Sequence, residues 1–159
     1  MTSLRQSQID EQYMDLALEL ARQAYAMNEV PVGALVVLDE RVLSEAHNRC
    51  IVDTDPCAHA EVIALRQAAA SHNNYRLEGA TLYVTLEPCL MCCGALLQSR
   101  IQRLVYGARE PRTGAVVSVH DSLRVAGVTH HIAITEGIRA DESKQLLNRF
   151  FETRRVNHE

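Results

Sequence analysis

Apolar residues recur along the chain with two different periods, and each period predicts a different kind of element. Over about 7–28 they recur at helical spacing, which predicts an amphipathic helix capped by Ser7. The apolar face of this helix consists of Ile9, Tyr13, Leu16, Leu20 and Ala24. A similar helix covers about 141–156, with Leu146, Leu147, Phe150 and Phe151 as its apolar stripe. Short runs rich in β-branched and aromatic residues, such as 81–85, predict strands instead.

The order of the predicted elements indicates the fold class. Helices are predicted over about 7–28, 58–71, 90–99 and 141–156, with a short helical stretch near 118–125, and strands over 34–38, 41–47, 81–85, 102–107 and 132–135. The first two strands form an antiparallel hairpin, and the later strands alternate with helices, which favours right-handed crossovers and parallel pairing. The sequence therefore predicts a three-layer α/β/α sandwich with a mixed five-stranded sheet. Residues 1–159 are expected to form a single domain.

Composition excludes several classes of protein. No apolar run is long enough for a transmembrane helix, and the first twenty residues lack the order of a signal peptide, so we expect a cytoplasmic protein without membrane contact. A net charge of −4 argues against a general nucleic-acid binder. However, Arg100, Arg103, Arg109 and Arg112 form a local basic strip. Such a strip could hold a few phosphates, although a solvated loop is the simpler interpretation.

The five cysteines do not have the pattern of a disulfide framework. Their number is odd, and Cys89, Cys92 and Cys93 lie within five positions. In a reducing compartment such a cluster is typical of a metal site or a catalytic site.

Two motifs together predict a zinc site. Cys89 and Cys92 are one helical turn apart and point the same way, and His59 begins the motif His-Ala-Glu at the start of another helix. Two thiolates and one imidazole favour zinc over magnesium or calcium. Three protein ligands leave the fourth tetrahedral position for water, which is typical of a catalytic site.

Glu61 lies two residues after His59 and is suited to face this open position without being a ligand. Such a carboxylate can take a proton from water, give it to a ring nitrogen of a nucleobase and protonate the departing amine. The combination H-x-E with P-C-x-x-C is the signature of zinc deaminases. The main alternative is a structural site with a third thiolate from Cys57 or Cys93. Otherwise Cys50, Cys57 and Cys93 are interpreted as buried or passive thiols.

With these motifs in place, the chain resembles the cytidine deaminase superfamily and, within it, the bacterial tRNA-specific adenosine deaminases. The similar segments are 29–34 (EVPVGA), 47–49 (HNR), 55–61 (DPCAHAE), 74–77 (NYRL), 80–92, 99–101, 106–109, 113–115, 135–138 and 150–151. The resemblance implies a homodimer with one zinc ion per subunit and no organic cofactor. It also implies conversion of the wobble adenosine of an arginine tRNA to inosine.

The resemblance also implies roles for residues beyond the zinc motif. Asn48 would hydrogen-bond the flipped adenine, and the backbone amide of Ala60 would help to hold the base. The residues implied near the anticodon loop are Arg109, Phe151, Arg154 and Arg155. Glu110 stands where an Asp is common in the family. Two alternatives remain open, a deaminase of free guanine or cytosine and a non-catalytic zinc-stabilised module, and Glu61 argues against the second.

Overall fold

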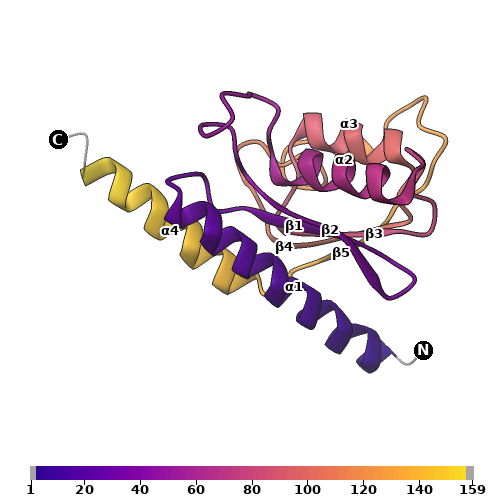
Figure 1. The fold of residues 1–159 in the computed structure, drawn as a ribbon, viewed down its shortest axis with the longest axis horizontal. Coiled ribbons are helices and arrows are strands. Elements are labelled where there is room, and N and C mark those ends of the chain that lie inside the picture. The colour runs from indigo at the N-terminus through magenta and orange to yellow at the C-terminus, as the bar shows by residue number, and fades with distance from the viewer. Residues whose placement is uncertain (1–2, 157–159) are drawn as a thin grey trace.

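Five strands form one mixed sheet in residues 3–156, which the computed structural model describes, and four α-helices cover its two faces (Figure 1). The strands are β1 (Gly33–Leu38), β2 (Arg41–His47), β3 (Thr81–Leu86), β4 (Arg103–Ala108) and β5 (Ala133–Glu136). The helices are α1 (Ser3–Ala26), α2 (Ala60–His72), α3 (Leu90–Ser99) and α4 (Ala140–Val156), with a 3₁₀ turn η1 (Ser122–Arg124). Within residues 3–156, no helix is both long and apolar enough to cross a bilayer.

The sheet confirms the predicted α/β class. Its strand order is β2-β1-β3-β4-β5. β1 pairs antiparallel with both β2 and β3, whereas β3, β4 and β5 are parallel. Helices α1 and α4 lie on one face and α2 and α3 on the other (Figure 1). Because Leu86 and Ala108 are register partners, β3 and β4 end at the same edge, where ligands of such sheets bind.

The first helix differs from its prediction at its start and on its buried face. It begins at Ser3, so Ser7 lies inside the helix and is not its cap. Leu16 is 42% exposed and does not belong to the core. The buried apolar face is formed by Met14, Ala17, Leu18, Leu20, Ala21 and Ala24, of which Leu20 and Ala24 were predicted. The small alanines let the helix approach the sheet so closely that a Cβ atom at Gly33 would overlap the backbone of Ala17.

Two other predictions also need correction. The short helix near 118–125 is only the single turn η1, and the rest of the segment is irregular. Of the two phenylalanines in the predicted stripe of α4, Phe150 is buried but Phe151 is 44% exposed. Adjacent residues of a helix point in different directions, so only one of the pair faces the core.

A buried ion pair joins α1 to the sheet. Arg103 on β4 donates from Nη1 and Nη2 to the two carboxylate oxygens of Asp10, at 2.8 and 2.5 Å. The Tyr83 hydroxyl and the Gln6 amide donate to the same carboxylate, at 2.8 and 3.0 Å. Burial alone would raise the pKa of Asp10, but these hydrogen bonds outweigh it and lower that pKa. Arg103 therefore does not belong to an exposed basic strip.

Replacing Asp10 by Asn should lower the free energy of unfolding by about 3 kcal/mol, because Arg103 is left partly buried without its counter-ion. Since the folded-state pKa of Asp10 is lowered, the pair stabilises the fold above about pH 4 and is lost as the pH falls through that lowered value. Urea denaturation of both proteins at neutral and at strongly acid pH measures the difference. If the two proteins differ as much in free energy of unfolding at acid pH as at neutral pH, this account is wrong.

Candidate metal centre and active site

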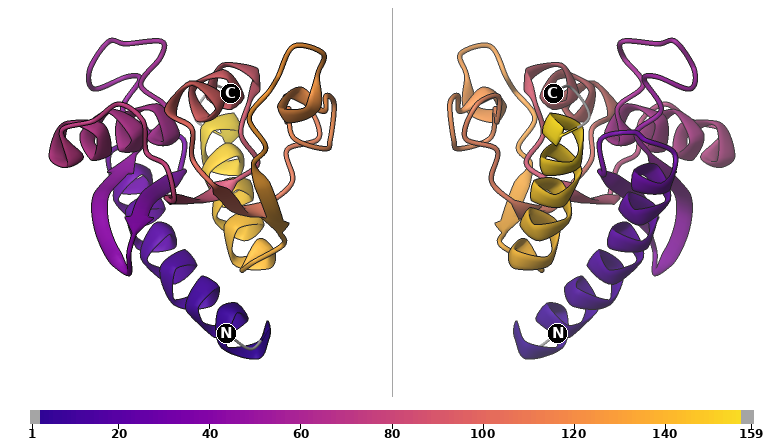
Figure 2. Two further views of the ribbon diagram at one scale, coloured as in Figure 1. Left: turned by 90° about the vertical axis from the view of Figure 1, so that its right-hand side faces the viewer. Right: turned by 90° about the vertical axis from the view of Figure 1, so that its left-hand side faces the viewer.

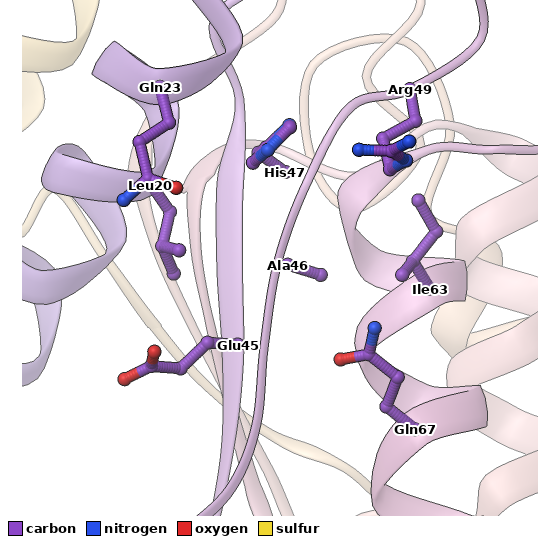
Figure 3. Close-up of a pocket in the computed structure, with 8 residues that line it drawn as sticks. All are labelled: Leu20, Gln23, Glu45, Ala46, His47, Arg49, Ile63 and Gln67. Carbon is purple, nitrogen blue, oxygen red and sulfur yellow. The ribbon is translucent and has the colours of Figure 1, made fainter. Parts of the chain in front are cut away.

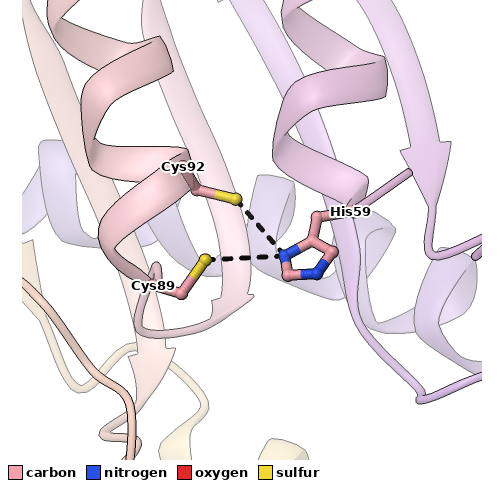
Figure 4. A group of neighbouring side chains, drawn as sticks. All are labelled: His59, Cys89 and Cys92. Atoms are coloured by element: carbon pink, nitrogen blue, oxygen red, sulfur yellow. Dashed lines mark hydrogen bonds between the residues drawn. The ribbon is translucent and has the colours of Figure 1, made fainter. Parts of the chain in front are cut away.

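The three predicted ligands come together where two helices begin (Figure 4). His59 is the residue before α2 and Cys89 the residue before α3, and both have extended backbones. Cys92 lies in the first turn of α3. The side chains therefore meet at the amino ends of two helices, where the helix dipoles favour thiolates.

The distances between these side chains fit a tetrahedral metal ion. His59 Nδ1 lies 3.6 Å from Cys89 Sγ and 3.5 Å from Cys92 Sγ, and all three ligand atoms lie within 4.8 Å of one another. Zn–S bonds of about 2.3 Å and Zn–N bonds of about 2.05 Å at the tetrahedral angle place N and S about 3.6 Å apart. The residues present thus fit zinc without rearrangement.

The three side chains of the cluster differ in how firmly they hold a proton. Hydrogen bonds from Cys92 and His59 lower the pKa of Cys89 to about 4, so Cys89 is a thiolate at neutral pH. The hydrogen bond to Cys89, together with burial, raises the pKa of Cys92. The hydrogen bond to Cys89 also raises the pKa of His59. A zinc ion that binds here must therefore displace the proton of the Cys92 thiol.

Glu61 lies beside the cluster but is not part of it. It is in the first turn of α2, is 4% exposed and has its carboxyl group in hydrogen-bonding reach of the Cys92 thiol. Burial raises the pKa of this carboxyl. Among the described residues, the group able to hold a metal consists of His59, Cys89 and Cys92 alone. Glu61 therefore lies beside the group of residues that could hold a metal and is not one of its members.

Asn48 and Ala60 contact each other directly. The Ala60 N–H donates to Asn48 Oδ1 at 2.8 Å. The Ala60 amide is therefore already engaged, in contrast to its expected role of holding the base. Because the oxygen of the Asn48 side chain faces Ala60, the amide nitrogen of Asn48 is the donor left for a ligand.

The other cysteines do not join the metal cluster. Cys93 is buried, and its sulfur lies 3.9 Å from the Pro88 carbonyl oxygen. Cys50 is half-buried, and Cys57 is exposed rather than buried. In the part of the chain that the structure describes, neither Cys57 nor Cys93 offers the third thiolate of a structural site.

The residues expected near RNA are partly engaged within the protein. Arg109 is exposed and donates to both oxygens of the Glu136 carboxylate. Arg154 donates to the Asn28 carbonyl and lies over the Phe150 ring. Arg155 is exposed, as is Phe151. In the part of the chain that the structure describes, none of these residues belongs to the group that could hold a metal.

The loop before α2 and the loop after β4 lie on opposite sides of α4 in the views of Figure 2. Each loop is held by a buried carboxylate that sequence reasoning missed. Glu29 Oε1 accepts the N–H groups of Ile51 and Val52, at 2.8 and 2.7 Å, in the loop before α2. Glu87 holds the loop after β4 in the same way. The signal in the sequence is an acidic residue directly before an apolar or proline-containing run, as in Glu29-Val30-Pro31 and Glu87-Pro88.

A separate cleft of about 380 Å³ lies between α1, β2 and α2 (Figure 3). Its lining residues are Leu20, Gln23, Glu45, Ala46, His47, Arg49, Ile63 and Gln67. None of these belongs to the metal cluster, although His47 and Arg49 flank Asn48. Arg49 is tied to Asp53 by two hydrogen bonds of 2.9 Å. The cleft therefore lies next to Asn48 and does not contain the residues that could hold a metal.

Comparison with known proteins supports the assignment of the site. Residues 7–108 match the cytidine and deoxycytidylate deaminase zinc-binding region. The tRNA-specific adenosine deaminase of Haemophilus influenzae is 50% identical over 150 residues, which cover 94% of this chain and 87% of that protein. The chain belongs to the tRNA-specific adenosine deaminase family. Zinc is the cofactor of its deaminase region, in agreement with the donor set described above.

Solved structures share the fold to different degrees. One, from a study of A-to-I editing by tRNA:A34 deaminases at the wobble position of transfer RNA, has a TM-score of 0.83 at 43% identity and covers 86% of this chain and 99% of its own. A guanine deaminase from Nitrosomonas europaea has a TM-score of 0.74 at 26% identity, covering 88% and 83%. The first of these agrees with the family assignment. The second shows that the same scaffold also carries a free-base deaminase.

Proposed function

We propose that the chain is a zinc-dependent hydrolytic deaminase that converts adenosine to inosine at the wobble position, A34, of a tRNA, and that the substrate is an arginine tRNA. The observation that carries the proposal is the spacing of His59, Cys89 and Cys92, with Glu61 buried beside them. A single deaminase domain over residues 1–159 would hold the whole site, and a tRNA substrate implies a location in the cytoplasm.

The chemistry depends on proton movements at Glu61. Zinc held by His59, Cys89 and Cys92 would lower the pKa of the water that attacks the ring carbon bearing the amino group. Glu61 would accept the first proton of this water and deliver it to a ring nitrogen. It would then take the second proton, from the hydroxyl group now on the ring carbon, and give it to the amine as the C–N bond breaks. Water is consumed and ammonia is released, so atoms and charge balance. The raised pKa of Glu61 suits a group that must both take and give a proton.

Asn48 would orient the base. Its side-chain oxygen is fixed by the Ala60 N–H, so its amide nitrogen would donate to an acceptor on the flipped nucleoside. Ala60 would thus act through Asn48. Its N–H would contact the base only after its hydrogen bond to Asn48 Oδ1 is broken. A fixed amide orientation costs no reorganisation when the base enters.

The RNA would contact the protein around this site. Phe151 offers an exposed ring for stacking, and Arg155 offers an exposed charge for a phosphate. Arg109 and Arg154 would exchange their present partners for the RNA, at small cost because these contacts are exposed or partly exposed. α4 runs toward the end of the molecule at which the loop before α2 lies (Figure 1). This arrangement supports an RNA path from the helix end to the metal.

One assay tests the proposal against its alternatives. Zinc-loaded protein is incubated with an arginine anticodon stem-loop carrying adenosine at position 34 and, in parallel, with free adenosine, guanine, cytosine and cytidine. We expect inosine in the stem-loop, with a rate that falls steeply as salt rises, because phosphate contacts release counterions. Turnover of free guanine with an inert stem-loop would instead assign the chain to the free-base deaminases. Tightly held zinc without turnover of any substrate would indicate a binding module.

A homodimer is the second part of the proposal. Leu90 and Met91 on α3 and Val117 and Val119 in the adjacent loop are apolar and exposed, Leu90 to 61%. The loop is joined to the start of α3 by the hydrogen bond from the Ala115 N–H to the Pro88 carbonyl, at 2.9 Å. Exposed apolar residues gathered in this way are typical of interfaces. Light scattering should return twice the 17.8 kDa chain mass, and Leu90→Glu should return a single chain.

A further inference from the structure

Glu87 is a buried carboxylate that the proposed chemistry does not use. It follows β3 directly and precedes the ligand Cys89 by two residues. Only 2% of its surface is exposed. Its backbone N–H donates to the Ala108 carbonyl at the end of β4, at 2.8 Å. A charged group at such a position must find its hydrogen-bond partners inside the protein.

Those partners all come from one loop, residues 110–118. Glu87 Oε1 accepts the N–H of Glu110 at 3.0 Å and the hydroxyl of Ser118. Its Oε2 accepts the N–H groups of Val116, Val117 and Ser118, at 3.1, 2.9 and 3.0 Å. Five donors from both ends of the loop thus converge on one carboxylate. A carboxylate offers about four lone-pair sites and no donor, so this arrangement suits its ionised form.

The loop is also shaped around this carboxylate. A Cβ atom at Gly114 would overlap the carboxylate of Glu87 and the carbonyl oxygen of Glu110, so no other residue fits there without displacement. The Ala115 N–H donates to the carbonyl of Pro88, the residue just before Cys89, at 2.9 Å. The loop is therefore fastened to the chain on both sides of Glu87 and next to a metal ligand.

The position of the loop relates it to the substrate site. Leu86 on β3 and Ala108 on β4 are register partners, so the segments that follow them leave the same edge of the sheet side by side. One segment leads to Cys89 and the other to the loop. In sheets of this kind the ligand lies beyond the carboxyl ends of the parallel strands, between such segments.

We propose that Glu87 is a positioning residue of the active site, which holds the loop 110–118 against the Cys89 turn as a wall of the RNA-binding site. This inference rests on the proposed function, because it assigns the loop to the same site. Glu87 touches neither the metal ligands nor the base. Its effect passes through the backbone of the loop, and it should therefore influence binding of the RNA more than the chemical step.

The test uses Glu87→Gln in the full chain, with the exposed Glu78→Gln as its matched control. Gln keeps the size of the side chain, but its amide nitrogen must face one of the two groups of donors. Amide hydrogen exchange within 110–118 should become at least about tenfold faster, while the exchange of β1 and β3 and the zinc content stay unchanged. KM for the stem-loop should rise about tenfold, with kcat changed less than about threefold.

Unchanged exchange in the loop overturns the proposal. Equally accelerated exchange throughout the chain, or a loss of kcat at constant KM, overturns it as well. If Glu87→Gln does not fold, Ser118→Ala removes one of the five hydrogen bonds, and the same loop should then exchange about threefold faster. A wild-type chain that edits no stem-loop refutes the proposed function, whereas the exchange measurement still decides whether Glu87 holds the loop.

Discussion

Replacing Glu61 by Gln should lower kcat for deamination by at least about a thousandfold and leave the zinc content unchanged. The substitution keeps the size of the buried side chain but removes its ability to accept and donate a proton. Glu61 lies outside the ligand group of His59, Cys89 and Cys92, so the metal should stay bound. Inosine formation in the stem-loop and zinc content by atomic spectroscopy measure the two effects on the same sample.

The matched control is Glu78→Gln, which makes the same chemical change at an exposed position and should retain full activity. Glu61→Ala should behave like Glu61→Gln in both measurements. Loss of zinc from both Glu61 variants would mean that the carboxylate is a ligand, and the proton-transfer role would then be wrong. Retained activity in Glu61→Gln would mean that another group moves the protons.

The chemistry of the site was predictable from the sequence because it depends on local geometry. Cys89 directly precedes α3 and Cys92 lies in its first turn, and this spacing of three brings two sulfurs to the same side. His59 and Cys89 each precede a helix, and turn-to-helix junctions are visible in the sequence as proline and polar residues before an apolar run. The class of the sheet followed in the same way from the alternation of strands and helices.

Features that depend on partners far away in the sequence were not predictable. Arg103 was assigned to a basic strip, yet its carboxylate partner Asp10 lies 93 positions earlier. Glu29 and Glu87 received no role from the sequence, because the N–H groups that they hold lie 22 to 31 positions later. The place of β1, antiparallel beside β3, is a pairing of the same long-range kind. The pattern of a single sequence indicates the period of helices and strands and their ends. It does not indicate which residues far apart in the chain contact each other.

Replacing Cys92 by Ser should lower the zinc affinity by about a thousandfold or more and abolish deamination at ordinary zinc concentrations. A hydroxyl is a far poorer zinc ligand than a thiolate, so the substitution leaves two strong protein ligands, His59 and Cys89. Competition with a chromophoric chelator measures the affinity. In both proteins the affinity should fall as the pH is lowered, because the ligands must lose their protons when they bind zinc.

Cys93→Ala is the matched control, because Cys93 is the next residue of the same helix and is also buried. Its sulfur contacts the Pro88 carbonyl and lies outside the metal group, so its loss should leave zinc affinity within about threefold of the wild type. An equal loss of zinc from Cys92→Ser and Cys93→Ala would instead indicate a structural site with three thiolates. A loss of zinc affinity in Cys92→Ser alone would show that the site has three protein ligands. The fourth position is then open to water, as hydrolytic deamination requires.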